Sequence, residues 1–309
     1  MATFAKLQPA TSAIHRRYSH ASNTSSLPEY ELGDYAQFQR LTVTASQSES
    51  SSLPDYDTLD ASTSASSAAS AVASFNNTSA FQIDTAGHPL FYLPLPPKAI
   101  PIPIFRVQTD GTVGELAYES LRNKRSSGSC ALVRAGHDVS EAPVCSTTYR
   151  FGPGKNPQIQ LHGRLDPNET YEAQGKGLTT RAQSIRTHLG TFEWRYASRS
   201  DRKALGASSL LLFERVTTVA LAGGKSEERR SVLGMFVRNA ELRTHGTHGC
   251  TAGNGGRLLL NLTEWADAKV EHEQMEILAI SSCIMMLKKE IDRRRVQQFM
   301  MMNGGGGGP

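Results

Sequence analysis

The sequence predicts a mostly β fold: a closed antiparallel β-barrel of about twelve strands around a hydrophobic C-terminal α-helix. Residues 275–287, MEILAISSCIMML, are apolar on nearly every side, which is typical of a helix that is buried all round. Upstream lie short β-prone runs separated by Gly, Pro and Asp. Strands followed by a single helix exclude an alternating βαβ fold. Barrel closure removes exposed strand edges, and the helix fills an interior that would otherwise be hollow.

The chain divides by composition into three parts. Residues 1–80 are rich in Ser, Thr and Ala and hold few large apolar side chains, so burial cannot offset the entropy of ordering them. We expect a disordered arm there, followed by a barrel domain with its C-terminal helix at residues 81–302. Residues 303–309 are mostly glycine and predict a flexible tail.

Eight β-prone runs open the predicted domain at similar intervals. The first four are FQIDT, LFYLPL, IPIFRV and TVGELAYES. The second and third contain proline, which lacks the backbone N–H of a central strand, so they are expected at edge positions. The next four runs are CALVRAG, STTYRFG, PQIQLHG and TYEAQGKG.

The clearest strand is residues 191–196, where Phe192, Trp194 and Tyr196 share one face. We interpret these aromatics as core residues, so nucleic acid is not an expected partner. Residues 209–216, SLLLFERV, are apolar enough to be covered on both faces. The last predicted strands are SVLGMFVRN and RLLLNLT, with SEERR and HGTHGCTAGNGG as loops.

The long helix is expected to run from about residue 265 or 270 to residue 302. Its apolar part spans roughly 20 Å, well short of the roughly 30 Å of bilayer hydrocarbon, so no transmembrane span is expected. The first twenty residues lack the apolar core of a secretory signal, and the four cysteines show no C-x-x-C spacing. The sequence therefore predicts a cytoplasmic protein, with peripheral attachment to a membrane left open.

Two segments carry a resemblance to a known family. FEWRYASRSDRKALGASSLLLFERV and MEILAISSCIMMLKKEIDRRR resemble a fungal family of unknown function with a tubby C-terminal-like barrel, the fold of the plant LURP-one-related proteins that is also predicted for phospholipid scramblases. The likeness covers roughly residues 81–298. The likeness implies a barrel threaded by a hydrophobic helix. It also implies phosphoinositides as ligands, because tubby proteins bind them. Their lysine and arginine ligands do not align with positions here, so no site residue is carried over.

Charge is distributed unevenly along the chain. Residues 1–80 carry four Lys and Arg against seven Asp and Glu, a net charge of −3, so the remainder of a chain with a total of +4 carries +7. A basic domain favours an anionic partner, although ordinary solubility explains the same charge. The candidate residues for binding an anionic ligand are Arg181, Arg186, Arg195, Arg199, Arg202 and Lys203.

In that interpretation, Arg181, Arg186 and Arg195 project from the outer face of adjacent strands, and residues 199–203 lie on the connecting loop. Together they would form a phosphate-binding patch, because guanidinium groups bind phosphate with two parallel hydrogen bonds. A solvated face with scattered ion pairs is the alternative. A second basic group, in residues 288–295, follows the buried helix, where cations oppose the negative helix end. A nuclear-import or lipid contact is the alternative there.

One short pattern occurs twice in the predicted arm. The two copies resemble the proline-tyrosine ligands of WW domains, with Leu27, Pro28 and Tyr30 in the first and Leu53, Pro54 and Tyr56 in the second. Two copies would allow bivalent binding. The alternative is chance in a segment of biased composition.

No catalytic pattern accompanies these features. There is no G-x-S-x-G, and no cysteine shares a recognisable motif with a histidine. The loop residues His245, His248 and Cys250 lack a fourth metal ligand nearby, so neither a metal nor a cofactor is expected. We therefore expect a non-enzymatic intracellular module that binds anionic membrane lipid, such as a phosphoinositide, or protein partners. The alternatives are an adaptor for WW-domain proteins and scramblase-like lipid transport.

Overall fold

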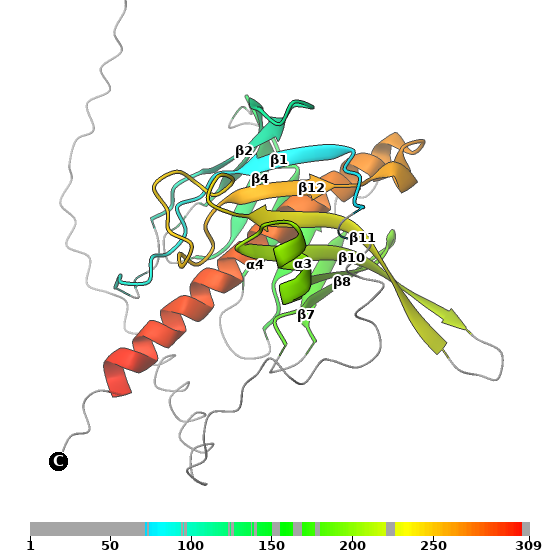
Figure 1. Ribbon diagram of the computed structural model, residues 1–309. Coiled ribbons are helices and arrows are strands. Elements are labelled where there is room, and N and C mark those ends of the chain that lie inside the picture. The colour runs from blue at the N-terminus through cyan, green and yellow to red at the C-terminus, as the bar shows by residue number, and fades with distance from the viewer. Residues whose placement is uncertain are drawn as a thin grey trace, which may run out of the picture. The chain divides into compact units, whose positions relative to one another are not determined.

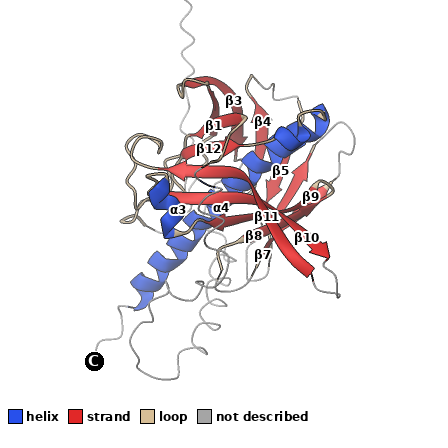
Figure 2. Cartoon of the chain, turned by 45° about the vertical axis from the view of Figure 1, so that its right-hand side comes forward, coloured by secondary structure: helices blue, strands red, loops and turns tan. Residues whose placement is uncertain are grey.

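The computed structural model describes residues 72 and 74–304, apart from residues 94, 96–97, 123, 125–126, 137, 139–140, 150–154, 163–168, 177–179 and 221–225. Within this part the chain forms a closed antiparallel β-barrel of twelve strands with a long helix inside it (Figures 1 and 2). The predicted fold class is confirmed. Most of the predicted arm, 1–80, and the last five residues of the predicted tail lie outside the described residues.

The strands follow one another around the barrel in sequence order, and pairing of the last with the first closes it. The closing contact aligns Ser79 with Leu260 and Ile83 with Gly256. The strands are β1 (Ser79–Ile83), β2 (Ile102–Val107), β3 (Val113–Leu121), β4 (Cys130–Arg134), β5 (Cys145–Thr148), β6 (Gln158–Leu161), β7 (Thr170–Gly175), β8 (Gln183–Thr187), β9 (Gly190–Tyr196), β10 (Ser209–Ala220), β11 (Ser226–Arg238) and β12 (Gly256–Leu260).

Helix α4 (Lys269–Gly304) passes through the barrel, preceded by the single turn η1 (Thr263–Trp265). It begins one residue before the later of the two expected starts and ends two residues beyond the expected end. Ile280 and Ile284 are buried, as the barrel prediction requires. Thirty-six residues at about 1.5 Å rise make a helix of roughly 54 Å, so its C-terminal half emerges from the barrel (Figure 1).

Two of the polar residues that interrupt the apolar helix, Glu276 and Ser282, have partners on the barrel wall. Trp194 donates its indole N–H to Ser282 Oγ at 2.8 Å. Tyr118 donates its hydroxyl to Glu276 Oε1 at 2.9 Å. A buried polar group costs free energy unless it is hydrogen-bonded, so these contacts explain why the helix tolerates Glu276 and Ser282 inside the core.

A second hydrophobic cluster covers the outside of β10 and β11. It comprises Val72, Ala197, Leu210, Leu212, Met235 and Val237. Leu210 to Glu214 are all buried, which confirms that both faces are covered over this part of β10, whereas residues 215–220 are partly or fully exposed. Phe75 packs against this cluster and β1 begins at Ser79, so packing starts earlier than residue 81, the predicted start of the domain.

Four local predictions are wrong. Residues 102–107, IPIFRV, do not lie at an edge, because β2 pairs with both β1 and β3. Residues 90–95, LFYLPL, form no strand where they are described, and β1 pairs directly with β2. Prolines at 89 and 94 deprive this run of ladder donors. Residues 226–230, SEERR, are not a loop but the first part of β11, where they pair with the end of β10. Residues 199–203 are not a loop either, because α3 (Arg199–Ala204) forms there.

Two elements carried weaker signals than the predicted runs. α3 begins at a capping box, in which Ser198 accepts from the backbone N–H of Asp201 and Asp201 accepts from that of Ser198. Strand β8 was not among the β-prone runs. Its only large apolar residue is Ile185, which leaves little period-two signal.

Candidate functional site: a basic pocket at one end of the barrel

The antiparallel strands place alternate loops at opposite ends of the barrel. We name the end where α4 emerges the exit mouth. It comprises the described residues of loops 84–101, 122–129, 149–157, 176–182, 197–208 and 239–255, with α4 residues 288–304. The other end, the entry mouth, comprises the described residues of loops 108–112, 135–144, 162–169, 188–189 and 261–268, with α4 residues 269–276.

The two mouths carry opposite charge. Among the described residues, the exit mouth has fifteen Lys and Arg against five Asp and Glu, whereas the entry mouth has one Lys against nine Asp and Glu. A low-dielectric body with one sign of charge at each end focuses its field at those ends and attracts ions of opposite sign there. The exit mouth therefore attracts anions.

A polar cavity of about 300 Å³ opens at the exit mouth. It is bounded by the end of β9, the start of β10, the end of β11, the loop after β11 and α4. Its lining residues are Arg181, Tyr196, Ser208, Ser209, Arg238, Gly249, Cys250, Thr251, Ala252, Asn254, Glu290, Arg293, Arg294 and Gln297.

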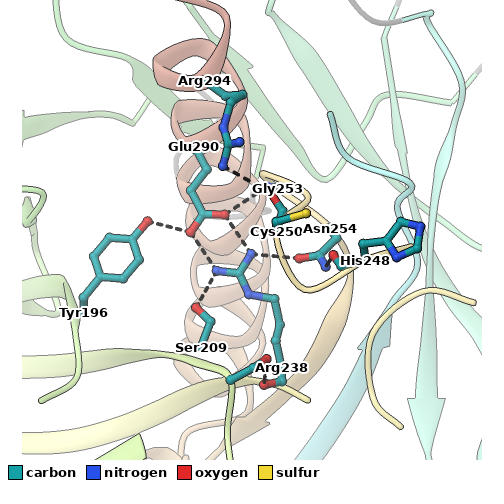
Figure 3. A network of polar contacts seen from close by, with 10 residues as sticks. Tyr196, Ser209, Arg238, His248, Cys250, Gly253, Asn254, Glu290 and Arg294 are labelled. Carbon is teal, nitrogen blue, oxygen red and sulfur yellow. Dashed lines mark hydrogen bonds and ion pairs between the residues drawn. The ribbon is translucent and has the colours of Figure 1, made fainter. Parts of the chain in front are cut away.

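The floor of this pocket is a buried ion pair. Arg238 donates from its two terminal nitrogens to the two carboxylate oxygens of Glu290, at 2.7 Å each (Figure 3). Tyr196 donates its hydroxyl to Glu290 at 2.5 Å, and the backbone N–H of Gly253 donates to Glu290 at 3.0 Å. Arg238 also donates to Asn254 at 3.1 Å. The floor is thus neutral overall and densely hydrogen-bonded.

Ionisation of the floor follows from these contacts. Burial alone would raise the pKa of Glu290, but hydrogen bonds from Arg238, Tyr196 and Gly253 and the charge of Arg238 hold it below its ordinary value. Burial and the Glu290 carboxylate together raise the pKa of Tyr196 to about 12. At neutral pH the carboxylate is therefore charged and the phenol keeps the proton that it donates.

The rim of the pocket is cationic. Arg181 lies with its guanidinium carbon 5.6 Å from the centre of the Tyr196 ring. Arg294 donates to the backbone carbonyl of Cys250 at 3.1 Å, which positions it beside the loop after β11 (Figure 3). Arg293 lines the same cavity. Glu290 is the only acid among the described lining residues and is already paired, so the rim presents three guanidinium groups over a neutral floor.

The six predicted anion-binding residues do not form one patch. Arg181 alone lines the pocket, while Arg199, Arg202 and Lys203 lie on α3 at the same mouth. Arg186 sits opposite Thr191, next to the turn at the entry mouth. Arg195 binds the carboxylate of Glu214 with two hydrogen bonds, at 2.8 and 2.6 Å.

Arg195 belongs to a charged network on the outer face of the barrel. Glu193 and Glu214 are aligned on β9 and β10, and both are buried. Arg230 lies 3.3 Å from each carboxylate, and Lys176 lies 2.6 Å from Glu193. Two buried carboxylates side by side need neighbouring cations. This requirement explains why Arg195 pairs with Glu214 instead of joining an anion-binding patch.

The sequence predicts Arg293 and Arg294 as part of a basic segment at the end of the helix, but it does not predict that they lie beside Arg181. Convergence with a residue more than a hundred positions upstream depends on the order of strands around α4, which no local pattern encodes.

The remaining candidates either form no site in the described part of the chain or lie outside it. His245, His248 and Cys250 form no group of metal ligands with neighbouring acids or histidines. The two predicted WW-domain ligands, residues 27–30 and 53–56, lie outside the described residues. Among the described helices, none combines the length and apolar character needed to cross a bilayer.

Comparison of the chain with protein-family models, with curated proteins and with solved structures finds no match.

Proposed function

We propose that this chain is a non-enzymatic binding module that takes the phosphate groups of an anionic membrane lipid, such as a phosphoinositide, into the pocket at the exit mouth. The observation that carries this proposal is the convergence of Arg181, Arg293 and Arg294 over a floor whose own charges cancel. Arginine suits phosphate because its planar fork donates two parallel hydrogen bonds. A neutral floor leaves the rim charge free to act on the ligand.

The charge of the whole exit mouth supports a membrane surface as the place where the ligand is found. Each basic residue held close to an anionic membrane contributes about 1 kcal/mol. A surplus of ten positive charges at one mouth, fifteen against five, orients the barrel with that mouth toward such a surface. The cytoplasmic leaflet carries the anionic lipids, so we place the protein in the cytoplasm, peripheral to that leaflet.

The test compares Arg181→Gln with Arg186→Gln. Both arginines are exposed, but only Arg181 lines the pocket, and Arg186 lies toward the entry mouth. Co-sedimentation with phosphatidylcholine vesicles that do or do not contain a phosphoinositide measures the affinity. Loss of about 1 kcal/mol corresponds to roughly a fivefold weaker affinity for Arg181→Gln. Arg186→Gln should retain wild-type affinity.

A soluble inositol phosphate provides the second arm of the test. Binding of this headgroup by calorimetry, weakened by Arg181→Gln and unchanged by Arg186→Gln, would locate the phosphate in the pocket without any bilayer. Equal effects of the two variants would show that only overall charge matters, and they would overturn the pocket assignment.

A further inference from the structure

Among the described residues, most exposed large hydrophobic side chains lie at the exit mouth. Of eleven such side chains among the described residues, six lie between Leu90 and Ile100 and three at residues 300–302. The other two, Val113 and Val270, lie near the entry mouth. Phe91 is 94% exposed. Exposed apolar side chains gathered at one place mark an interaction surface.

This apolar surface is fixed to the pocket by specific contacts. Gln298, near the end of α4, donates to the carbonyl oxygens of Pro89 at 3.2 Å and Leu90 at 2.6 Å, and its own carbonyl oxygen lies 2.7 Å from His88 Nε2. The backbone of His88 exchanges two hydrogen bonds with Ala252, which lines the pocket. The loop after β1 and the end of α4 therefore lie together at the exit mouth (Figure 1).

The side-chain types at this surface are those of a membrane interface. Phe91, Leu93 and Leu95 offer aromatic and aliphatic groups, while Tyr92 has an apolar ring and a polar tip, as residues at the headgroup level do. Lys98 follows within the same loop and is exposed. A surface of apolar side chains flanked by cations binds at the boundary of an anionic bilayer. The apolar side chains are buried among the lipids, and the cations pair with the anionic headgroups.

We propose that the exposed apolar side chains of residues 90–93, 95 and 300–302 insert into the headgroup and acyl boundary of an anionic bilayer while the pocket holds a headgroup, an inference that rests on the proposed function. A second copy of the chain is a poorer occupant, because a self-complementary contact through this surface would bring two exit mouths with a surplus of ten positive charges each together. An anionic bilayer matches both the apolar side chains and the surrounding charge.

Phe91→Trp tests insertion directly. The native tryptophans, Trp194 and Trp265, are 0% and 5% exposed, so they report little from outside the barrel. The matched control is Val113→Trp, at a position that is 50% exposed near the entry mouth. The variants are mixed with phosphatidylcholine, phosphatidylserine and phosphoinositide vesicles whose acyl chains carry bromine. On anionic vesicles we expect quenching and a blue shift of the fluorescence of Phe91→Trp, and neither change for wild type or Val113→Trp.

A second variant separates insertion from headgroup binding. Phe91→Ser with Leu93→Ser should weaken vesicle affinity at least tenfold and leave affinity for a soluble inositol phosphate unchanged. If the fluorescence of Phe91→Trp is not quenched although the protein binds the vesicles, insertion is wrong and the proposed function stands. If neither vesicles nor the inositol phosphate bind, both proposals fail. If sedimentation shows a dimer that Phe91→Ser with Leu93→Ser abolishes, the surface is a contact between copies and insertion is overturned.

Discussion

Glu290 joins four parts of the fold through one carboxylate. It stands on α4 and accepts hydrogen bonds from Arg238 on β11, Tyr196 on β9 and Gly253 in the loop after β11. A helix inside a barrel cannot join the ladder of backbone hydrogen bonds between strands, so its axial position depends on side-chain contacts such as these and the bond from the Tyr149 hydroxyl to the carbonyl oxygen of Met285 at 3.1 Å. Arg293 and Arg294 follow one turn later, and the Glu290 contacts therefore set the position of the pocket rim.

Breaking this ion pair on one side should destabilise the barrel strongly. Arg238→Met leaves the Glu290 carboxylate buried without its cation, which costs about 3–5 kcal/mol. Arg238→Met with Glu290→Met should regain much of that loss, because no buried charge remains. Urea denaturation of the three proteins measures the free energies of unfolding. A double variant as unstable as Arg238→Met would show that shape, and not charge, is what the site requires.

The same pair gives the protein a defined response to acid. The pKa of Glu290 is lower in the fold than in the unfolded chain, so its stabilisation is present above the ordinary pKa and is lost as pH falls through the folded value. Wild type should therefore lose stability relative to Arg238→Met with Glu290→Met as pH falls below about 4. An unchanged difference between pH 7 and pH 3 would contradict the assignment of a charged carboxylate.

Residue identities at the pocket were only partly predictable. The positive charges of Arg181 and of the basic residues after residue 287 can be read directly from the sequence. It does not show that Arg195 is committed to Glu214, since that partner comes from the adjacent strand. Nor does it show that Glu290 is buried, because its neighbours in the sequence are cations, a pattern that is typical of a solvated helix end.

Among the elements, α4 was predictable and the loops at its exit were not. Thirteen consecutive helical residues with almost no polar face allow one environment only, which is burial on every side. The run LFYLPL read as a strand because its composition is β-prone, yet its prolines prevent pairing and its large apolar side chains are exposed. Local composition therefore predicts the wrong conformation for this run, because pairing with neighbouring strands decides whether it becomes a strand.

The loop after β11 approaches α4 so closely that one position excludes a side chain. Gly253 has a φ of +63°, and a Cβ there would lie 2.6 Å from the carbonyl oxygen of Leu287. Gly246, in the same loop, has a φ of +77° with open space around the Cβ position. The two glycines share the left-handed backbone conformation, but only Gly253 is also enclosed.

Gly253→Ala should therefore destabilise the protein more than Gly246→Ala. Both variants incur the backbone strain of a non-glycine residue at positive φ, about 1 kcal/mol. Gly253→Ala also forces the loop away from α4 and weakens the N–H contact to Glu290. Thermal unfolding compares the two variants with wild type. Equal losses would mean that backbone strain is the whole effect and that the loop moves freely from the helix.

For the whole molecule, the net charge conceals the separation of charge between the two mouths. A formal charge of +4 describes a mildly basic chain, and the sequence alone cannot separate the two mouths because their loops alternate along the chain. Once the strand order is known, the charges separate into a cationic exit mouth and an acidic entry mouth. The same end carries the pocket and most of the exposed large hydrophobic side chains of the described residues, so charge, cavity and apolar surface coincide there.

Salt should therefore weaken vesicle binding in a way that distinguishes the two contributions. Raising ionic strength from about 0.1 M to about 1 M shortens the screening length from roughly 10 Å to roughly 3 Å, which removes most attraction between exposed charges. Affinity for anionic vesicles should fall steeply over this range, and the affinity that remains should depend on Phe91 and Leu93, because apolar burial is not screened. Co-sedimentation at both salt concentrations, with neutral vesicles as control, measures the two contributions. Binding that is insensitive to salt, or residual binding that survives Phe91→Ser with Leu93→Ser, would contradict a mouth that combines charge with insertion.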